Sequence, residues 1–307
     1  MTNQNTQTPK FPEFMSNLKK FLLSIWSKIK QMLQSIYSNK QTAIGFTILA
    51  VFVLLAIFGP MIFPYDQATN WENRYAPISF EHWLGTDELG RDIFRQLIFG
   101  AGNVLSIALL TAIFTVCIGV TLGIISGFAG GTVDKIIQGI TNLFLTIPSF
   151  PILLLLAQLI TIEDALTFAL VLSIWNWAGL CRAIRAQIMS LKERDFIQIC
   201  KVMNMSQTHI IFKELLPNIY SYVIVNFVMI MKSAITGSVG IMMLGLAAFE
   251  PSNWGAMIHR ARVQGLINPD ALAFLLKPLV AVVLFQVGAL LFANGLDELL
   301  NPRLKVN

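Results

Sequence analysis

The sequence predicts an all-α, polytopic membrane protein with six transmembrane helices. Of its 307 residues, 55% are hydrophobic and only 13% are charged, whereas a soluble domain carries about 25% charged residues. Several uncharged apolar runs reach the roughly 20 residues that a helix needs to cross a bilayer. Basic and acidic segments alternate between these runs, as expected of loops on opposite sides of a membrane.

The first 40 residues precede the first span. Residues 1–10 are polar, and apolar side chains recur at three- and four-residue spacing, among lysines, over residues 11–36. This pattern is typical of a basic amphipathic helix, which we expect on the membrane surface because a span follows directly. A partner-binding helix is the alternative. No short apolar region with a small-residue cleavage site stands at the start, so no cleavable signal peptide is expected.

Long uncharged runs divide the rest of the chain. The first span falls in residues 41–64, and a polar outer segment at 65–95 separates it from a core domain at 96–294 and a tail at 295–307. The predicted spans are residues 42–64, 104–128, 136–162, 165–180, 219–246 and 271–293.

Glycine and proline add detail to two of these spans. Gly119, Gly123 and Gly127 are four residues apart, a stripe that lets another helix approach closely. Residues 127–131 are glycine-rich but lack the Gly-Lys-Ser/Thr ending of a phosphate-binding loop, so a tight turn is expected there. Pro148 and Pro151 interrupt the third span and should kink it.

The charge distribution orients the spans. The N-terminal flank is rich in lysine, and residues 182–214 hold six Lys and Arg against three acids. The segments at 65–95 and 163–164 are net acidic. Basic residues collect on the cytoplasmic side, which also accounts for the net charge of +5 without invoking nucleic acid. Both termini and the loop at 181–218 are therefore predicted to be cytoplasmic.

No catalytic arrangement is found. The three histidines fall in three different loops, and the three scattered cysteines fit no metal site or disulfide pattern. The sequence also lacks a nucleotide-binding motif. We expect no catalytic residue, no metal site and no cofactor bound by this chain. A six-span protein with one large basic cytoplasmic loop fits a transport subunit driven by a separate ATPase; a self-contained channel is the rival, and a membrane enzyme the weakest alternative.

The stretch at 191–218 carries the strongest functional signal. A helical pattern ends near Met203, Asn204 breaks it, and Ser206 can cap a second short helix that Pro217 would end. This resembles the EAA loop of ABC importer permeases, with Gln198 at the first position of the triplet and Asn204 at the position of its glycine. Asparagine tolerates the left-handed backbone that glycine would supply.

A second stretch narrows the family. Residues 82–92 read HWLGTDELGRD and resemble the LGTDxxGRD signature of oligopeptide/dipeptide-type ABC importer permeases. Shorter similar stretches are residues 100–103, 147–149, 254–257, 295–297 and 301–304.

These resemblances imply a type I ABC importer permease fold in a prokaryotic plasma membrane. The implied partners are a second homologous permease, two ATP-binding subunits that hold ATP and Mg²⁺, an extracellular solute-binding protein and membrane lipid. Oligopeptides or dipeptides are the implied cargo, and nickel chelates or oligosaccharides are alternatives. The residues expected to meet an ATPase through the coupling helix are Asp195, Gln198, Lys201, Asn204, Met205 and Ser206.

Lys232 is the charge deepest inside a predicted span. A lysine at the centre of a membrane helix costs roughly 2.5–3.5 kcal/mol, so it should face protein or a water-filled path. We predict a face at the permease–permease interface or along the substrate path, where Lys232 forms a structural ion pair or meets an anionic substrate group. Lys277, nearer the end of its span, can snorkel. The candidate residues of this face are Asn226, Lys232, Ser233 and Thr236, with Gly237 and Gly240 expected to pack on the partner.

The role of the outer segment is predicted less sharply. Thr86 can cap a helix whose first turn holds Asp87 and Glu88. Arg91 and Asp92 are expected to pair with each other or with a partner chain. A structural role is favoured over contact with substrate.

Overall fold

The computed structural model describes residues 33–247, 250–265 and 272–300, together with Ser24, Ser27, Lys30 and Gln31. Within these residues five helices are long and apolar enough to cross a membrane, and a bent pair makes a sixth if it counts as one span. The all-α, multi-span prediction is therefore confirmed. The main helices are α2 (Lys40–Ile62), α3 (Ile93–Ala129), α4 (Gly131–Thr146), α5 (Ser149–Leu159), α6 (Ala165–Lys192), α7 (Asp195–Val202), α9 (Leu216–Met243), α10 (Trp254–Gly265) and α11 (Leu272–Leu300).

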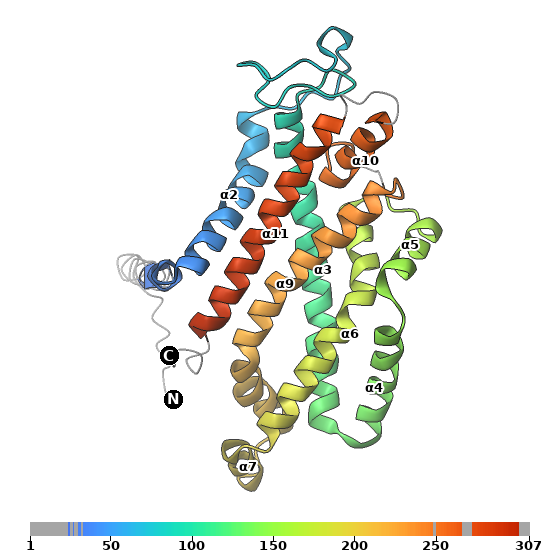
Figure 1. Ribbon diagram of the computed structural model, residues 1–307. Coiled ribbons are helices and arrows are strands. Elements are labelled where there is room, and N and C mark those ends of the chain that lie inside the picture. Colours follow the sequence, from blue (N-terminus) through green and yellow to red (C-terminus); the bar gives the residue numbers. More distant parts are fainter. Residues whose placement is uncertain are drawn as a thin grey trace, which may run out of the picture.

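The helices form an elongated bundle with two different ends (Figure 1). The segment between α2 and α3 lies at one end with α10, and α7 lies at the other. Where α2 begins and α11 ends, the amide of Asn39 donates to the carboxylate of Glu298 at 2.7 Å. The predicted surface helix at residues 11–36 falls mostly outside the described residues, and the tail at 301–307 falls wholly outside them.

The predicted glycine stripe brings α3 and α6 together. A Cβ atom added to Gly123 would lie 2.7 Å from the Cβ of Ile184, and one added to Gly127 would lie 2.9 Å from that of Ile188. Such distances leave no room for a side chain, so the backbones approach as closely as predicted. The glycine-rich turn is also confirmed, because Gly130 and Gly131 adopt φ values of +67° and +57° between α3 and α4.

The third predicted span is broken more sharply than a kink. The axes of α4 and α5 meet at 88°. Ile147 is extended, with ψ of 130°, because a residue before proline is pushed out of the helical region. Pro148 precedes α5, and Pro151 lies in its first turn, where a helix tolerates proline.

Two predicted helix ends are wrong. The helix of the fourth predicted span does not end near Leu180, because α6 continues to Lys192 and includes the first residues of the predicted loop at 181–218. Pro217 does not end a helix either, since helical structure continues from Gln207 to Met243. Pro217 lies at the first turn of α9, where the missing N–H has no helical acceptor to lose.

The loop expected at residues 249–270 contains α10, which packs against α9 and α11. Trp254 is buried, and its indole N–H donates to the Leu97 carbonyl at 3.0 Å. The predicted topology places Trp254 outside the membrane, and the burial of its side chain leaves it out of reach of a labelling reagent. The apolar ring lies against α2, where Phe52 is 5.5 Å away between centroids.

Candidate functional site

α7 forms a short crosspiece at one end of the bundle, between α6 and the helical run that leads into α9 (Figure 1). Asn204 follows it with φ of +54°, the left-handed bend that the sequence predicts. The hydroxyl of Ser206 accepts the backbone N–H of His209 at 3.2 Å, as the predicted cap. The chain then passes through α8 (Gln207–His209) and the π-helical turn η2 (Ile210–Leu215) into α9.

α7 has a buried face and an exposed face. Ile197 and Cys200 are buried against side chains of α6 and η2. On the opposite side Ile199, Val202 and Met203 are 58%, 87% and 64% exposed. Three exposed apolar side chains on one short helix are unusual for a solvated surface and typical of an interaction site.

The predicted contact residues only partly coincide with this face. Asp195, Lys201, Asn204 and Ser206 are exposed, as expected. Gln198 and Met205 are half-buried, and the amide of Gln198 donates to the Lys192 carbonyl at 3.0 Å. Sequence reasoning missed Ile199, Val202 and Met203, because five of the six residues that it selected are polar and it did not follow the apolar side of the helix. The sequence does contain an indication of these contacts: α7 carries more apolar residues than one buried face can hold.

The base of α7 is fixed to the rest of the bundle through α6. The ammonium of Lys192 donates to the Phe128 carbonyl at 2.7 Å. The guanidinium of Arg185 makes two contacts of 2.5 Å with the carboxylate of Asp134, which also accepts the Ser126 hydroxyl at 2.5 Å. A bidentate arginine–carboxylate pair fixes orientation as well as distance. These contacts tie the end of α6 to the turn between α3 and α4.

The polar residues predicted on α9 do not all face the same way. The Gln286 amide on α11 donates to the Thr236 hydroxyl at 2.6 Å and to the Lys232 carbonyl at 3.2 Å. The Asn226 amide donates to the Tyr222 carbonyl of its own helix at 2.9 Å. Ser233 is exposed, and Lys232 is half-buried. No ion pair recorded among the described residues includes the Lys232 ammonium.

The two glycines expected to pack on a partner permease instead face this chain. A Cβ atom on Gly237 would lie 3.3 Å from Leu172 of α6, and one on Gly240 would lie 3.1 Å from Phe150 of α5. That expectation is wrong, because the small residues accommodate the broken span and α6. The exposed polar residues of α9 lie beside this contact.

A buried polar network organises the opposite end of the bundle. The guanidinium of Arg91 contacts the carboxylate of Asp87 at 2.8 Å, and the Gln96 amide donates to the same carboxylate at 2.8 Å. The guanidinium of Arg260 on α10 donates to the side-chain oxygen of Gln96 at 2.9 Å and lies 3.2 Å from the Glu88 carboxylate. The network joins the outer segment to α3 and α10, which agrees with the structural role predicted for it.

Two local expectations for this segment are wrong. No helix starts at Thr86, which forms an isolated bridge with Asp92. The Asp87 carboxylate accepts the N–H groups of Leu89 and Arg91, both at 2.9 Å, which shapes a loop instead of a helix. Asp92 does not pair with Arg91; it caps α3 and contacts His82 at 2.8 Å.

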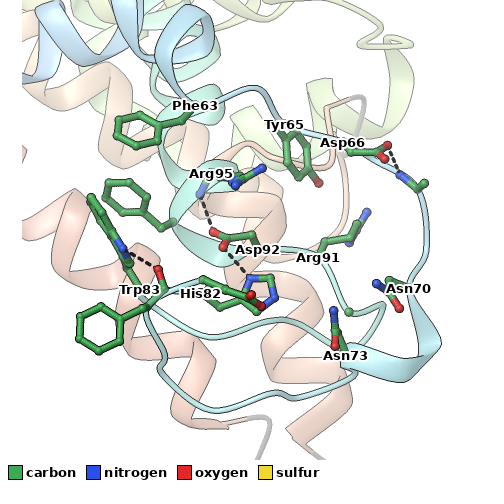
Figure 2. A pocket seen from close by; sticks show the side chains of 15 residues that line it. Phe63, Tyr65, Asp66, Asn70, Asn73, His82, Trp83, Arg91, Asp92 and Arg95 are labelled. Atoms are coloured by element: carbon green, nitrogen blue, oxygen red, sulfur yellow. Dashed lines mark hydrogen bonds and ion pairs between the residues drawn. The ribbon is translucent and has the colours of Figure 1, made fainter.

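A cavity of about 590 Å³ opens beside this network. In Figure 2, Asp92 lies between His82 and the backbone N–H of Arg95, with Phe63 and Trp83 on one side and Asn70 and Asn73 on the other. Tyr65 also lines it, and burial raises the pKa of its hydroxyl to about 12. The phenol therefore stays neutral at physiological pH. Within the described part of the chain no group of His, Cys, Asp and Glu could hold a metal ion.

Known proteins are similar to this chain in sequence. Residues 119–306 match the family of binding-protein-dependent transport system inner membrane components, and residues 27–77 match the N-terminal TM domain of oligopeptide transport permease C. The oligopeptide transport system permease protein OppC of Bacillus subtilis is 30% identical over 290 residues, covering 94% of this chain and 93% of the relative. The dipeptide transport system permease protein DppC of Alkalihalophilus pseudofirmus is 32% identical over 279 residues, covering 90% of each.

The glutathione transport system permease protein GsiD of Pectobacterium atrosepticum is 29% identical over 257 residues, covering 82% of this chain and 84% of the relative. The matches extend over the spans, the outer segment and α7. The chain therefore belongs to the inner membrane components of binding-protein-dependent transport systems, as a multi-pass permease subunit of an ABC importer and not an enzyme.

Proposed function

We propose that this permease pairs with a second, similar permease and forms with it the path through which oligopeptides or dipeptides enter the cell. Two ATP-binding subunits hold ATP and Mg²⁺ on the cytoplasmic side, and an extracellular solute-binding protein delivers cargo on the other. The names of the relatives support this substrate class, since two of them are oligopeptide and dipeptide permeases. This chain itself binds no cofactor.

The exposed apolar face of α7 is the observation that carries the proposal. Ile199, Val202 and Met203 project from a short helix whose other face is buried. In the proposed assembly these side chains fill a cleft on one ATPase, and exposed Asp195 and Lys201 form the polar rim of the contact. Burying apolar area would hold α7 in place, while charged rim residues select the partner.

Movement of the ATPase would then reach the spans as rigid-body motion. α7 is joined to α6 through two residues and to α9 through the turns α8 and η2. A π-helical turn is rare and often lies at a functional position, and η2 stands directly between the coupling helix and the span that carries Lys232. We propose that Asn226, Lys232 and Ser233 of α9 line the permease–permease interface or the substrate path.

The proposed organisation of the chain follows from this assembly. Residues 1–40 and 295–307 lie on the cytoplasmic side, 41–64 form the first span and 65–95 the outer segment. The core permease domain covers 96–294, with the cytoplasmic coupling loop at 181–218, whose first residues form the end of α6.

The coupling role is tested with Val202. In the intact complex, Val202→Asp should reduce ATPase binding and uptake of a labelled dipeptide together, because it places a charge in an apolar contact. Val202→Ile keeps the apolar character and is the matched control. Normal uptake by Val202→Asp at normal membrane level contradicts the proposed contact.

The cargo is tested separately by competition. Unlabelled di- and tripeptides should displace a labelled dipeptide from uptake, whereas a nickel chelate and an oligosaccharide should not. Displacement by either of those compounds alone would assign a different cargo to the same importer. Uptake that continues when the ATPase subunits are absent would instead identify a self-contained channel.

A further inference from the structure

An apolar groove lies on the outside of the bundle, between α2, α3 and α11. It encloses about 590 Å³, a volume within the range of pockets that hold small molecules. Val51 of α2 and Val280 and Leu284 of α11 line it and are exposed, so the groove is open along its length. Its floor is formed by half-buried residues of α2 and α3, among them Phe52 and Leu97.

One cation interrupts this apolar lining. Lys277 of α11 lines the groove, and its ammonium donates to the Leu84 carbonyl and lies 4.1 Å from the centre of the Phe274 ring. None of the ion pairs recorded within the described ranges includes Lys277. The ammonium group has three N–H donors, and the structure records one acceptor for them, the Leu84 carbonyl of the outer segment. The other donors can therefore bind an anion.

Aromatic rings surround the same end of the groove. Phe94 lines both the groove and the outer cavity, and its ring packs against Trp83 at 4.8 Å and Phe63 at 5.3 Å between centroids. Trp83 is exposed and its indole N–H donates to the Phe80 carbonyl at 3.1 Å. Exposed tryptophan side chains are enriched at the membrane–water interface, where the lipid headgroups lie. The cation and the rings therefore mark where the groove meets the interface.

We propose that this groove binds an anionic phospholipid of the surrounding bilayer. One acyl chain lies along α2 and α11 in the groove, and the headgroup phosphate meets the ammonium of Lys277. The groove needs an occupant that is apolar along its length and anionic at one end, and a membrane lipid has this form. A charge at membrane depth costs free energy unless it finds a counter-charge, and a headgroup phosphate would supply one.

The proposal goes beyond the transport role and does not depend on the cargo. Its alternative is that Lys277 only snorkels, with the Leu84 carbonyl as its sole partner. In that case the groove would hold whatever lipid is present, with no preference for charge. A partner subunit covering this face would exclude lipid from the groove altogether.

The native complex provides the first test. It is reconstituted with phosphatidylglycerol that carries a photoreactive group on an acyl chain, illuminated, and digested for peptide mapping. We expect adducts concentrated on α2 and α11 beside the groove, and competition by unlabelled phosphatidylglycerol but not by phosphatidylcholine. Adducts spread evenly over the exposed apolar faces, equal competition by both lipids, or cross-links to a partner subunit instead would overturn the proposal.

Two variants in the whole complex separate the parts of the site. Lys277→Met should reduce co-purified phosphatidylglycerol about fivefold, the share that one basic side chain contributes near a membrane surface. Lys135→Met, which removes a cation from α4 away from the groove, should leave it unchanged. Ala281→Phe fills the groove from α11 and should also release lipid, whereas Leu170→Phe on the exposed face of α6 should not.

Lipid retention is measured by native mass spectrometry after matched purification. Unchanged retention in both Lys277→Met and Ala281→Phe contradicts the proposed site. If Lys277→Met does not assemble, Ala281→Phe decides the question alone, because it adds no charge and keeps the Lys277 contact with Leu84.

Discussion

The side-chain amide of Gln286 on α11 donates to the hydroxyl of Thr236 on α9 at 2.6 Å. The same nitrogen reaches the Lys232 carbonyl at 3.2 Å. The contact engages the Thr236 hydroxyl within this chain, while the residue itself stays exposed. No ion pair recorded in the described part of the chain includes the Lys232 ammonium, so Lys232 is the first residue of the predicted face to test.

We expect Lys232→Met to reduce peptide uptake about tenfold, which corresponds to about 1.4 kcal/mol. The substitution removes a charge that costs roughly 2.5–3.5 kcal/mol to place in a helix centre, so the level of inserted protein should not fall. The measurement is uptake of a labelled dipeptide, normalised to membrane content. Met231→Leu at the neighbouring position is the control, and equal uptake by both variants would remove Lys232 from the functional face.

Asn204 tests the geometry of the coupling loop. Its φ is +54°. Glycine adopts this angle readily, whereas proline cannot, because its ring fixes φ near −65°. Asn204→Pro should uncouple ATP hydrolysis from uptake or release the ATPase, while Asn204→Gly should behave as the unmodified protein. ATPase activity and uptake are measured on the same vesicles. Full coupling in Asn204→Pro would show that the bend is dispensable.

Gly123 tests the contact between α3 and α6. A side chain there would meet the Ile184 side chain and the Cys181 carbonyl, both within 2.8 Å of an added Cβ. Gly123→Leu should lower the free energy of unfolding by about 1–3 kcal/mol, because a packed core accepts extra atoms only with strain. Gly139→Ala is the control, since nothing lies within 4 Å of that Cβ. The unfolding midpoint in detergent should fall for the first and hold or rise for the second.

The predicted orientation is tested by labelling intact cells with an impermeant thiol reagent. Glu72→Cys and Glu163→Cys should react, and Arg194→Cys should react only after the membrane is opened. All three positions are exposed in the structure. The native cysteines are first replaced by alanine, because Cys117 is exposed and would add background. Reaction at Arg194→Cys in intact cells would contradict the predicted topology. Lys28 and Lys305 are also predicted to be cytoplasmic, and both lie outside the described residues.

The sequence predicts the spans well because each is a long apolar run, and a bilayer requires such runs to be helical. It predicts helix ends poorly where a helix continues past its first charged residues, as from Cys181 to Lys192, or where proline stands in the first turn of one, as at Pro217. Charged residues after an apolar run, and a proline, are both ordinary indications that a helix ends, so the sequence predicts an end at each place. The helix actually ends after Lys192, where the short α7 must turn across the bundle.

Long-range pairing is what the sequence could not supply. Asp87 and Arg91 are close in the chain, but Arg260, which reaches Glu88 and Gln96, is distant. Gly237 and Gly240 show a small-residue pattern that predicts close packing but says nothing of the partner, which proved to be α6 and α5 of the same chain. Met205 is the one apolar residue of the predicted ATPase contact, and the apolar residues Ile199, Val202 and Met203 are recognised only from their exposure in the structure.

The close contact that Gly119, Gly123 and Gly127 allow between α3 and α6 affects how these two helices can move. Ile184 and Ile188 lie where side chains of α3 would otherwise be. A slide of α6 along α3, or a rotation about its own axis, would therefore press these side chains against the α3 backbone. We expect the two helices to move together along this contact, so that a displacement at Lys192 is passed to α3 as well as along the 28 residues of α6, about 42 Å.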